Sequence, residues 1–362
     1  MKKMKILHIA PFNYAGVPMI FVNAERKLGH YSRLIVLGAN IQERPGDIYL
    51  NLPFLDSVFV RLAKRFFTPL HRRLISYDTQ PIGEIPKIWK PSTPEKMLIK
   101  LREKVWQRRI DKLLEHMDFY NFDIYQLDGG LGFYRDSGII RELKKKGRKI
   151  VVCYTGSDLR TRGVIKGIDK ISDVNITVEF DHLSYHPDIK YVPFPFDFSS
   201  LPQRKISGSE SVVIGHAPTN RKAKGSDFII SVLKELQAEN PQVIINLIEG
   251  MPYKKALEKK SECDIFIDQI GNLGYGINSI ESMGMGIATC SCLAQGFKEA
   301  FPDNPFVEIN KENLKQKLQM LINNKNLRES IGNKSMEWVR EFHDSVQVVK
   351  KIHRIINISE TQ

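Results

Sequence analysis

The chain has 362 residues, of which 42% are hydrophobic and 26% charged, and its formal net charge at pH 7 is +13. This composition excludes collagen-like, disordered and disulfide-stapled proteins, and the length predicts two or three globular domains. The positive charge favours anionic partners, namely sugar nucleotides, acidic lipid headgroups or nucleic acid, without choosing among them.

The sequence shows no membrane-spanning segment and no metal-binding cysteine pattern. The apolar stretch near the N-terminus covers only residues 6–11, too short for a signal-peptide core, and predicts a first β-strand. Of the four cysteines, only Cys290 and Cys292 are close in sequence. Zinc sites usually need wider gaps and a second ligand pair. We therefore expect a cytoplasmic protein with small core cysteines and neither metal nor cofactor.

Strand-like and helix-like segments alternate through the first half of the chain. Short apolar runs predict strands at 5–10, 33–37, 123–127 and 149–154, and helical stretches follow the first strand and cover 137–146. This βαβ pattern is typical of a parallel sheet with helices on both faces. It predicts a Rossmann-like domain over residues 1–195.

Two basic stretches interrupt this pattern within a helical insertion at about 41–115. Residues 57–76 carry five Lys or Arg and no acidic residue, and 96–115 place apolar residues at helical spacing between basic ones. They predict either contact with an anionic membrane surface or helices that pack on the sheet with their charges in water.

The strand–helix rhythm restarts near residue 211. Strands are predicted at 212–216, 243–248, 263–267 and 287–290, and helices at 227–237, 253–260 and 277–285. A proline-rich linker near 194–210 separates this second Rossmann-like domain, 208–340, from the first. Ligands of such folds bind beyond the carboxyl ends of the strands, so we expect a site in a cleft between two facing domains.

Two loops of the second domain are candidates for binding a diphosphate and a ribose. The segment after strand 212–216 combines Arg221 and Lys224 with Gly225 at the start of a helix. The glycine-rich segment 271–286 leads into a helix that contains Glu281, whose carboxylate can accept two hydroxyl hydrogen bonds. The alternatives are a solvated basic turn and a Glu that only favours the helix dipole.

Two loops of the first domain also follow strands. Asp158 and Arg160 lie beyond strand 149–154, where either a cleft residue or a simple helix cap is expected. Gly16 follows the first strand and permits either close approach of a ligand or an ordinary turn.

Several catalytic motifs are absent from the sequence. GxSxG, HExxH, the P-loop pattern and Asp-x-Asp do not occur. Without Asp-x-Asp, we expect fixed cations rather than a metal ion to stabilise a diphosphate leaving group.

These features together resemble the group 1 (family 4) glycosyltransferases. The segments that carry the resemblance are, in order, MKILHIAPFNYAGVP, YTGSDLR, HAPTNRKAKGSDFI, and EGMPY with CDIFIDQIGNLGYGINSIESMGMGIA. The resemblance implies the α/β GT-B fold, with two Rossmann-like doubly wound domains facing each other across a cleft. It also implies a final helix, within 341–362, that packs back on the N-terminal domain.

The resemblance further implies transfer of a sugar from a nucleotide-diphosphate donor to a glycan, polysaccharide or lipid-linked acceptor, with retention and without metal. Arg221, Lys224 and Asp158 are the expected catalytic residues. The expected donor-binding residues are Gly16, Asn220, Arg221, Lys224, Gly225, Glu249, Gly274, Tyr275, Gly276, Ile277 and Glu281. Peripheral contact with an anionic inner membrane is compatible with this interpretation, and no nucleic-acid partner is expected.

Two positions depart from the family pattern. Leu273 replaces a Glu that usually faces the donor sugar, and Thr155 replaces a His before Gly-Ser-Asp. An alternative is therefore a catalytically degenerate GT-B protein that binds a sugar nucleotide or a partner glycosyltransferase. A GT-B sugar-nucleotide epimerase and a nucleic-acid binder are less well supported, because acid/base residues and a recognisable nucleic-acid module are lacking.

Overall fold

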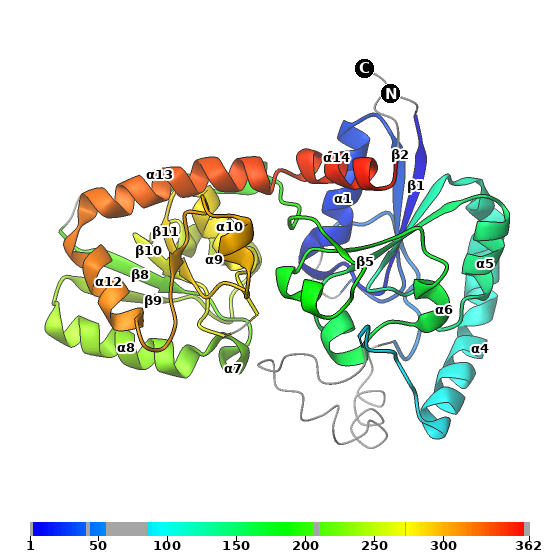
Figure 1. Ribbon diagram of the computed structural model, residues 1–362, viewed down its shortest axis with the longest axis horizontal. Helices are drawn as coiled ribbons and strands as arrows, with labels where there is room; N and C mark the ends of the chain where they lie inside the picture. Colours follow the sequence, from blue (N-terminus) through cyan, green and yellow to red (C-terminus); the bar gives the residue numbers. More distant parts are fainter. Residues whose placement is uncertain (1–2, 41–43, 56–84, 206–209, 272, 358–362) are drawn as a thin grey trace. The chain divides into compact units, whose positions relative to one another are not determined.

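The structure is a computed structural model that describes residues 3–40, 44–55, 85–205, 210–271 and 273–357. The chain divides into two compact units, which we call unit 1 (Met1–Pro195 with Ser345–Gln362) and unit 2 (Phe196–Asp344). Each unit contains one parallel sheet with helices on both faces (Figure 1). No helix in the described part of the chain combines the length and apolar character needed to cross a bilayer.

Unit 1 is built on a seven-stranded sheet in the order β3-β2-β1-β4-β5-β6-β7, and every pairing is parallel. The chain first builds outward from β1 to β3 and then crosses to β4 on the other side. The loops after β1 and β4 therefore diverge at a topological switch point. The strands are β1 (Lys5–Ala10), β2 (Tyr31–Val36), β3 (Ile48–Tyr49), β4 (Ile124–Asp128), β5 (Lys149–Tyr154), β6 (Val174–Thr177) and β7 (Lys190–Tyr191).

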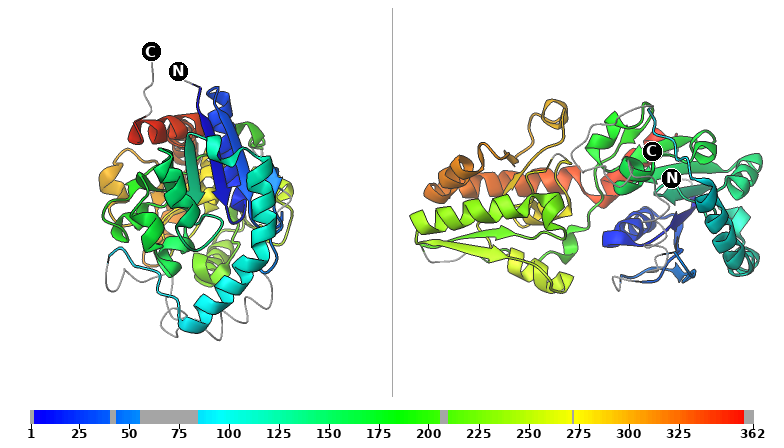
Figure 2. Two further views of the ribbon diagram at one scale, coloured as in Figure 1. Left: turned by 90° about the vertical axis from the view of Figure 1, so that its right-hand side faces the viewer. Right: turned by 90° about the horizontal axis from the view of Figure 1, so that it is seen from below.

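Helices cover both faces of this sheet because its central strands are apolar on both sides. On one face, α1 (Val17–Lys27) packs with α14 (Ser345–Ile355), which buries Val348, Val349 and Ile352. The larger core lies on the other face, under α4 (Thr93–His116), α5 (Gly138–Lys145) and α6 (Lys166–Asp169). Figure 2 shows the long α4 running along the outside of unit 1.

Unit 2 has a five-stranded parallel sheet in the order β12-β11-β10-β8-β9. Its switch point lies between β8 and β10, because β9 is on one side and β11 and β12 are on the other. The elements are β8 (Val212–His216), α7 (Arg221–Lys224), α8 (Ser226–Glu239), β9 (Val243–Leu247), α9 (Tyr253–Lys260), β10 (Ile265–Ile267), α10 (Ile277–Gly284), β11 (Ala288–Ser291), α11 (Phe297–Ala300), β12 (Val307–Glu308), α12 (Leu314–Asn323) and α13 (Lys325–Phe342).

The elements that the sequence predicted agree with the structure to within a few residues. The last helix begins at Ser345, because the helix before it, α13, ends at Phe342. The sequence analysis did not predict the short strands β3, β6, β7 and β12 or the helices α6, α11, α12 and α13. The basic stretch at 57–76 lies almost entirely within residues 56–84, outside the described residues.

The second basic stretch forms α4, which has an unusually small buried face. Ser92 and Glu95 form a capping box at its start, and only Trp106 and Ile110 are buried. Met97, Leu98, Leu101 and Val105 are exposed between its basic residues. Contact of this helix with an anionic membrane stays a prediction.

Candidate functional site

The switch point of unit 2 gathers most of the predicted donor-binding residues. The loop after β8 carries Asn220, Arg221, Lys224 and Gly225, and the loop after β10 leads through Gly274 and Gly276 into α10. Because β8 and β10 are adjacent and parallel, both loops leave the same edge of the sheet. This edge is where open α/β sheets bind their ligands.

Asp268, at the carboxyl end of β10, connects the two loops. Its Oδ1 accepts a hydrogen bond from Lys224 Nζ at 2.6 Å, and its Oδ2 accepts from the Gly276 N–H and the Ser279 hydroxyl, both at 2.8 Å. Burial alone would raise the pKa of Asp268, but Lys224 and these donors hold it below its usual value. The structure shows that Asp268 fixes Lys224 beside the first turn of α10.

Arg221 is held differently, at the surface. Its Nε and Nη2 donate to the two carboxylate oxygens of Glu249 at 2.8 and 2.5 Å. Asn220 caps the short α7 by accepting from the Ala223 N–H at 3.1 Å. An exposed pair of this kind is screened by solvent and contributes little to stability. An anionic ligand could therefore take the place of Glu249 at small cost.

Gly225 is required by the turn between α7 and α8. Its φ is 68°, and a Cβ there would lie 2.5 Å from Ile270 Cγ1. A side chain at this position would be strained by the backbone conformation and would clash with the core. The turn is what brings Lys224 against Asp268.

Glu281 occupies a buried position inside α10, where its carboxylate already has two protein partners. Tyr253 donates its hydroxyl proton to Oε1 at 2.8 Å, and buried Lys260 forms an ion pair with Oε2. Lys260 also donates to Asn278 Oδ1 at 2.8 Å. Each carboxylate oxygen has two lone pairs, so one remains on each oxygen for a ligand hydroxyl. The expected role in binding a ribose stays a prediction.

The remaining predicted donor residues of unit 2 have mainly structural contacts. The Tyr275 hydroxyl lies 3.1 Å from His343 Nε2, and its ring packs against Phe297 and Phe306. Ile277 is the first residue of α10 and is half-buried. Tyr275 thus anchors the glycine-rich loop to the aromatic cluster under α13.

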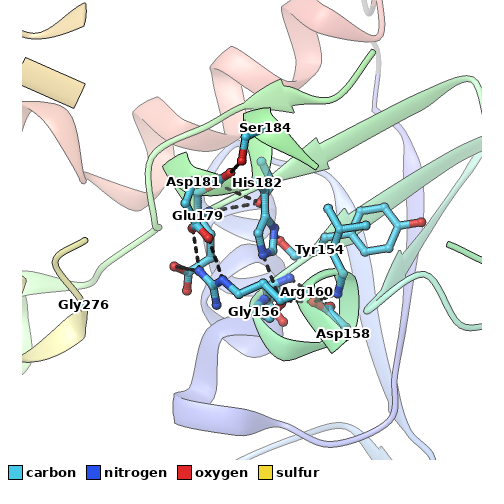
Figure 3. Close-up of polar contacts among 12 residues, drawn as sticks. Tyr154, Gly156, Asp158, Arg160, Glu179, Asp181, His182, Ser184 and Gly276 are labelled. Carbon is cyan, nitrogen blue, oxygen red and sulfur yellow. Dashed lines mark hydrogen bonds and ion pairs between the residues drawn. The ribbon is translucent and has the colours of Figure 1, made fainter. Parts of the chain in front are cut away.

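In unit 1, Asp158 caps the loop after β5. Its carboxylate accepts backbone N–H groups of Thr155, Gly156 and Leu159 at 3.0, 2.9 and 2.8 Å (Figure 3). The sequence left open a helix cap as an alternative, but the N-cap of the following helical turn is Ser157, and Asp158 instead binds N–H groups of its own loop. The predicted catalytic role of Asp158 remains untested by these contacts.

Arg160 stands next to this loop in an ion-pair network. Its guanidinium donates to Asp181 and Glu179 at 2.6–2.9 Å (Figure 3). Burial alone would lower the pKa of Arg160, but the two carboxylates raise it overall. His182 donates from Nε2 to the Gly156 carbonyl at 3.0 Å, and burial together with Arg160 lowers its pKa well below the usual value. The neutral His182 therefore anchors the loop after β5 through the Gly156 carbonyl.

Gly16 lies at the switch point of unit 1, between β1 and α1, with a φ of 76°. A Cβ there would lie 3.5 Å from Arg44 Nη1, so this glycine faces a basic side chain. Among the described residues, no group of three His, Cys, Asp or Glu could hold a metal ion. Cys153, Cys263 and Cys290 are buried.

Solved structures with distant sequences have the same architecture. HepE of Anabaena, in complex with UDP and glucose, covers 98% of this chain and 100% of its own, at 13% identity and a TM-score of 0.58. The catalytic domain of starch synthase IV from Arabidopsis thaliana, bound to ADP and acarbose, covers 98% of this chain and 99% of its own, at 10% identity and a TM-score of 0.60. A putative UDP-N-acetylglucosamine 2-epimerase from Listeria monocytogenes covers 98% of this chain and 96% of its own, at 12% identity and a TM-score of 0.54. The chain has the GT-B fold.

The GT-B fold was predicted from the sequence and is confirmed. No protein-family model and no curated protein matches the sequence. Membership of family 4 is not established by these matches, because identities of 10–13% show the fold alone. In this GT-B protein, unit 2 carries the predicted diphosphate and ribose residues, and unit 1 carries Gly16 and Asp158.

Proposed function

We propose that the protein is a glycosyltransferase that moves a sugar from a nucleotide-diphosphate donor to a glycan, polysaccharide or lipid-linked acceptor, with retention and without a metal ion. One observation carries the proposal. Buried Asp268 holds the Lys224 ammonium beside the Gly276 N–H at the unit 2 switch point. A fixed cation and a helix N-terminus at this edge suit a diphosphate.

The two basic residues of the loop have different roles in this proposal. Lys224 stays paired with Asp268 and offers its remaining protons to the diphosphate. Arg221 exchanges its exposed contact with Glu249 for a phosphate oxygen when the donor binds. Both then stabilise the negative charge that develops on the leaving nucleotide.

The similar solved structures support binding of a nucleotide more strongly than they support glycosyl transfer. The titles of the HepE and starch synthase structures name UDP and ADP, and one neighbour is a putative epimerase. In this chain, the carboxylates of Asp158, Glu179 and Asp181 are engaged by backbone N–H groups or by Arg160. This arrangement favours transfer over acid/base epimerisation.

A second candidate is a sugar-nucleotide-binding protein without transferase activity. Leu273 and Thr155 stand where the resembling family has polar residues, and Glu281 is paired with Lys260. Binding of a donor without its hydrolysis or transfer would favour this candidate.

The test is a thermal-shift series with UDP-, GDP-, ADP- and CMP-sugars, each with and without EDTA. A ligand that binds only the folded state raises the melting temperature. We expect one nucleotide class to raise it and EDTA to leave this shift unchanged. No shift with any nucleotide sugar would overturn the proposal.

The residue-level test removes the Lys224 charge together with its buried counter-ion. Lys224→Ala alone would leave Asp268 uncompensated, so Lys224→Ala is combined with Asp268→Asn, which keeps an acceptor for Gly276 and Ser279. We expect the double variant to fold and to lose at least about 100-fold in kcat. Lys222→Ala, an exposed lysine on the same helix, is the control. Wild-type turnover in the double variant would contradict the proposed role.

A further inference from the structure

Three arginines of unit 1 lie near the edge of the sheet where β4 and β5 end, and none of them has a carboxylate partner among the described residues. Arg135 and Arg162 lie in the segments after these strands, and Arg102 lies on α4; the charges of Arg162 and Arg102 both act on Arg135. The Arg135 N–H donates to Glu103 Oε1 at 2.7 Å, which ties the β4 loop to α4. We propose that these residues, the arginine cluster, bind a phosphate group of the acceptor, an inference that rests on the proposed glycosyl transfer.

Arg162 is held rigidly, but only by neutral groups. Its Nε donates to the Gly163 carbonyl at 3.0 Å, and its Nη2 donates to the Gly129 carbonyl. Carbonyl dipoles orient the guanidinium without cancelling its charge. The other N–H donors of the Arg162 guanidinium are left to bind a ligand.

The other two guanidinium groups lie over aromatic rings. Arg102 is 4.3 Å from the ring centroid of Trp106, and Arg135 is 5.2 Å from that of Trp89. Arg102 Nε is buried and has no hydrogen-bond partner. Stacking fixes the plane of a guanidinium and leaves its edge free to meet an oxyanion.

The nearby carboxylates are used for other purposes. Glu103 accepts the Arg135 backbone N–H, and Asp158 accepts three backbone N–H groups of its own loop. Over the described ranges, none of the three guanidinium groups has a carboxylate oxygen within 4.0 Å. By contrast, Arg160 has two carboxylates within that distance.

The pKa directions agree with this difference. Burial, and then repulsion by Arg162 and Arg102, lowers the pKa of Arg135, and burial lowers the pKa of Arg102 and of Arg162. An arginine nevertheless stays charged in a protein. The three side chains are half-buried and lack a carboxylate partner over the described ranges, so a bound anion would compensate their charge.

A phosphate group fits the cluster better than a carboxylate. Three guanidinium forks present a positive charge that a dianion balances more completely than a monoanion, and arginine matches phosphate in a bidentate geometry. The nucleotide diphosphate is assigned to unit 2 in our proposal. The anion in unit 1 is therefore placed on the acceptor.

The test measures binding of inorganic phosphate in the Lys224→Ala/Asp268→Asn background, in which the unit 2 loop lacks its cation. We expect phosphate to raise the melting temperature, and Arg135→Gln or Arg162→Gln to weaken its binding at least tenfold. Arg141→Gln, an exposed arginine on α5, is the matched control and should bind phosphate normally. Without phosphate, Arg135→Gln should melt at or above the temperature of its parent, because it removes repulsion; an arginine in an ordinary ion pair would do the opposite.

Three outcomes would overturn the proposal: no phosphate effect in the parent protein, unchanged phosphate binding in both Gln variants, or a lower melting temperature of ligand-free Arg135→Gln. Equal stabilisation by acetate or glucuronate would assign the cluster to a carboxylate instead and overturn the phosphate assignment. The nucleotide-sugar shift is measured separately in Arg135→Gln with an intact unit 2 loop. If phosphate binds at the cluster but no nucleotide sugar binds the wild type, the transferase proposal fails and the anion site stands.

Discussion

Lys260 is the buried ion-pair partner of the Glu281 carboxylate. It lies at the end of α9, fully buried, with its Nζ bound to both Glu281 and Asn278 and placed 4.8 Å from the ring centroid of Phe266. Buried charged groups are normally paired, and Lys260 is the partner of Glu281. The same ion pair therefore compensates a buried charge and fixes the orientation of the Glu281 carboxylate.

Separating these two roles requires a paired substitution. Lys260→Met should lower the free energy of unfolding by about 3–5 kcal/mol, because it leaves a buried charge uncompensated. Adding Glu281→Leu should recover most of this loss, since replacing a whole buried pair with apolar residues is often close to neutral. If Glu281 holds the ribose, the folded double variant should bind the donor nucleotide at least tenfold more weakly. Urea unfolding and calorimetry measure the two effects.

The control for this prediction is Lys259→Met, which removes an exposed lysine paired with Glu262 at 2.9 Å. It should leave the free energy of unfolding almost unchanged, because solvent screens an exposed ion pair. Wild-type nucleotide affinity in the double variant would remove Glu281 from the ribose site.

At the scale of elements, the site depends on turns between short segments. The turn from α7 to α8 brings Lys224 to Asp268, and the cap formed by Asp158 shapes the loop after β5. Neither turn is stabilised by an extended helix or strand of its own. Each depends on contacts with a neighbouring strand end.

Gly225→Ala tests the first of these turns. The substitution forces an alanine into a left-handed conformation and places its Cβ 2.5 Å from Ile270. We expect a loss of about 1–3 kcal/mol in unfolding free energy and weaker donor binding, because Lys224 is displaced. Gly250→Ala is a matched control, with a φ of 62° and no atom within 4 Å of the added Cβ. It should show only the conformational cost, about 1 kcal/mol, and equal losses in the two variants would contradict the packing argument.

For the molecule as a whole, the two faces of the unit 1 sheet differ. The face under α4 and α5 is almost entirely apolar, whereas the face under α1 buries His8, Glu25 and Ser32, with Glu25 Oε2 accepting from His8 and Ser32 at 2.9 and 2.6 Å. Asp128 lies at the switch-point end of β4, and its Oδ2 is buried without a hydrogen-bond partner. The stability of unit 1 should therefore depend on pH.

Asp128→Asn tests this dependence. Burial raises the pKa of Asp128 from 3.8 to about 6, so ionising this carboxyl costs the folded state more than the unfolded state. The cost is absent well below pH 3.8, grows as the pH rises to about 6, and is constant above that, at about 3 kcal/mol. Asp128→Asn should therefore raise the free energy of unfolding by up to this amount at pH 7.5 and by much less at pH 4.5. An equal gain at both pH values would show that ionisation of Asp128 is not the cause.

Much of the fold could be predicted because its signals are local. Runs such as KIVVCY are apolar over the whole length of a strand, and Tyr253–Lys260 was predicted with the bounds that the structure shows. The glycines of the two loops also marked turns correctly, since their conformations are set within a few residues. The position of Asp158 beyond a strand was predicted, but its contacts with three N–H groups of its own loop were not.

The partners of the charged site residues could not be predicted in this way. Lys260 is one of several lysines in α9, and nothing in its sequence neighbours distinguishes it from exposed Lys259. It meets Glu281 because α9 and α10 pack over the same strands. Arg160 and Arg162 are only two residues apart in the sequence. Arg160 has two carboxylate partners, whereas Arg162 donates to backbone carbonyls. The charged residues could be identified from the sequence, but their ion-pair partners could not.

The sequence by itself determined the fold class, most of the central strands, and the two loops that meet at the unit 2 switch point. These follow from hydrophobic period, glycine position and chain order, which act over a few residues. Only the tertiary structure decided which charges are paired with a carboxylate and which are not. Pairing depends on distances of a few ångströms between segments that are tens of residues apart in the chain, and burial strengthens each such interaction.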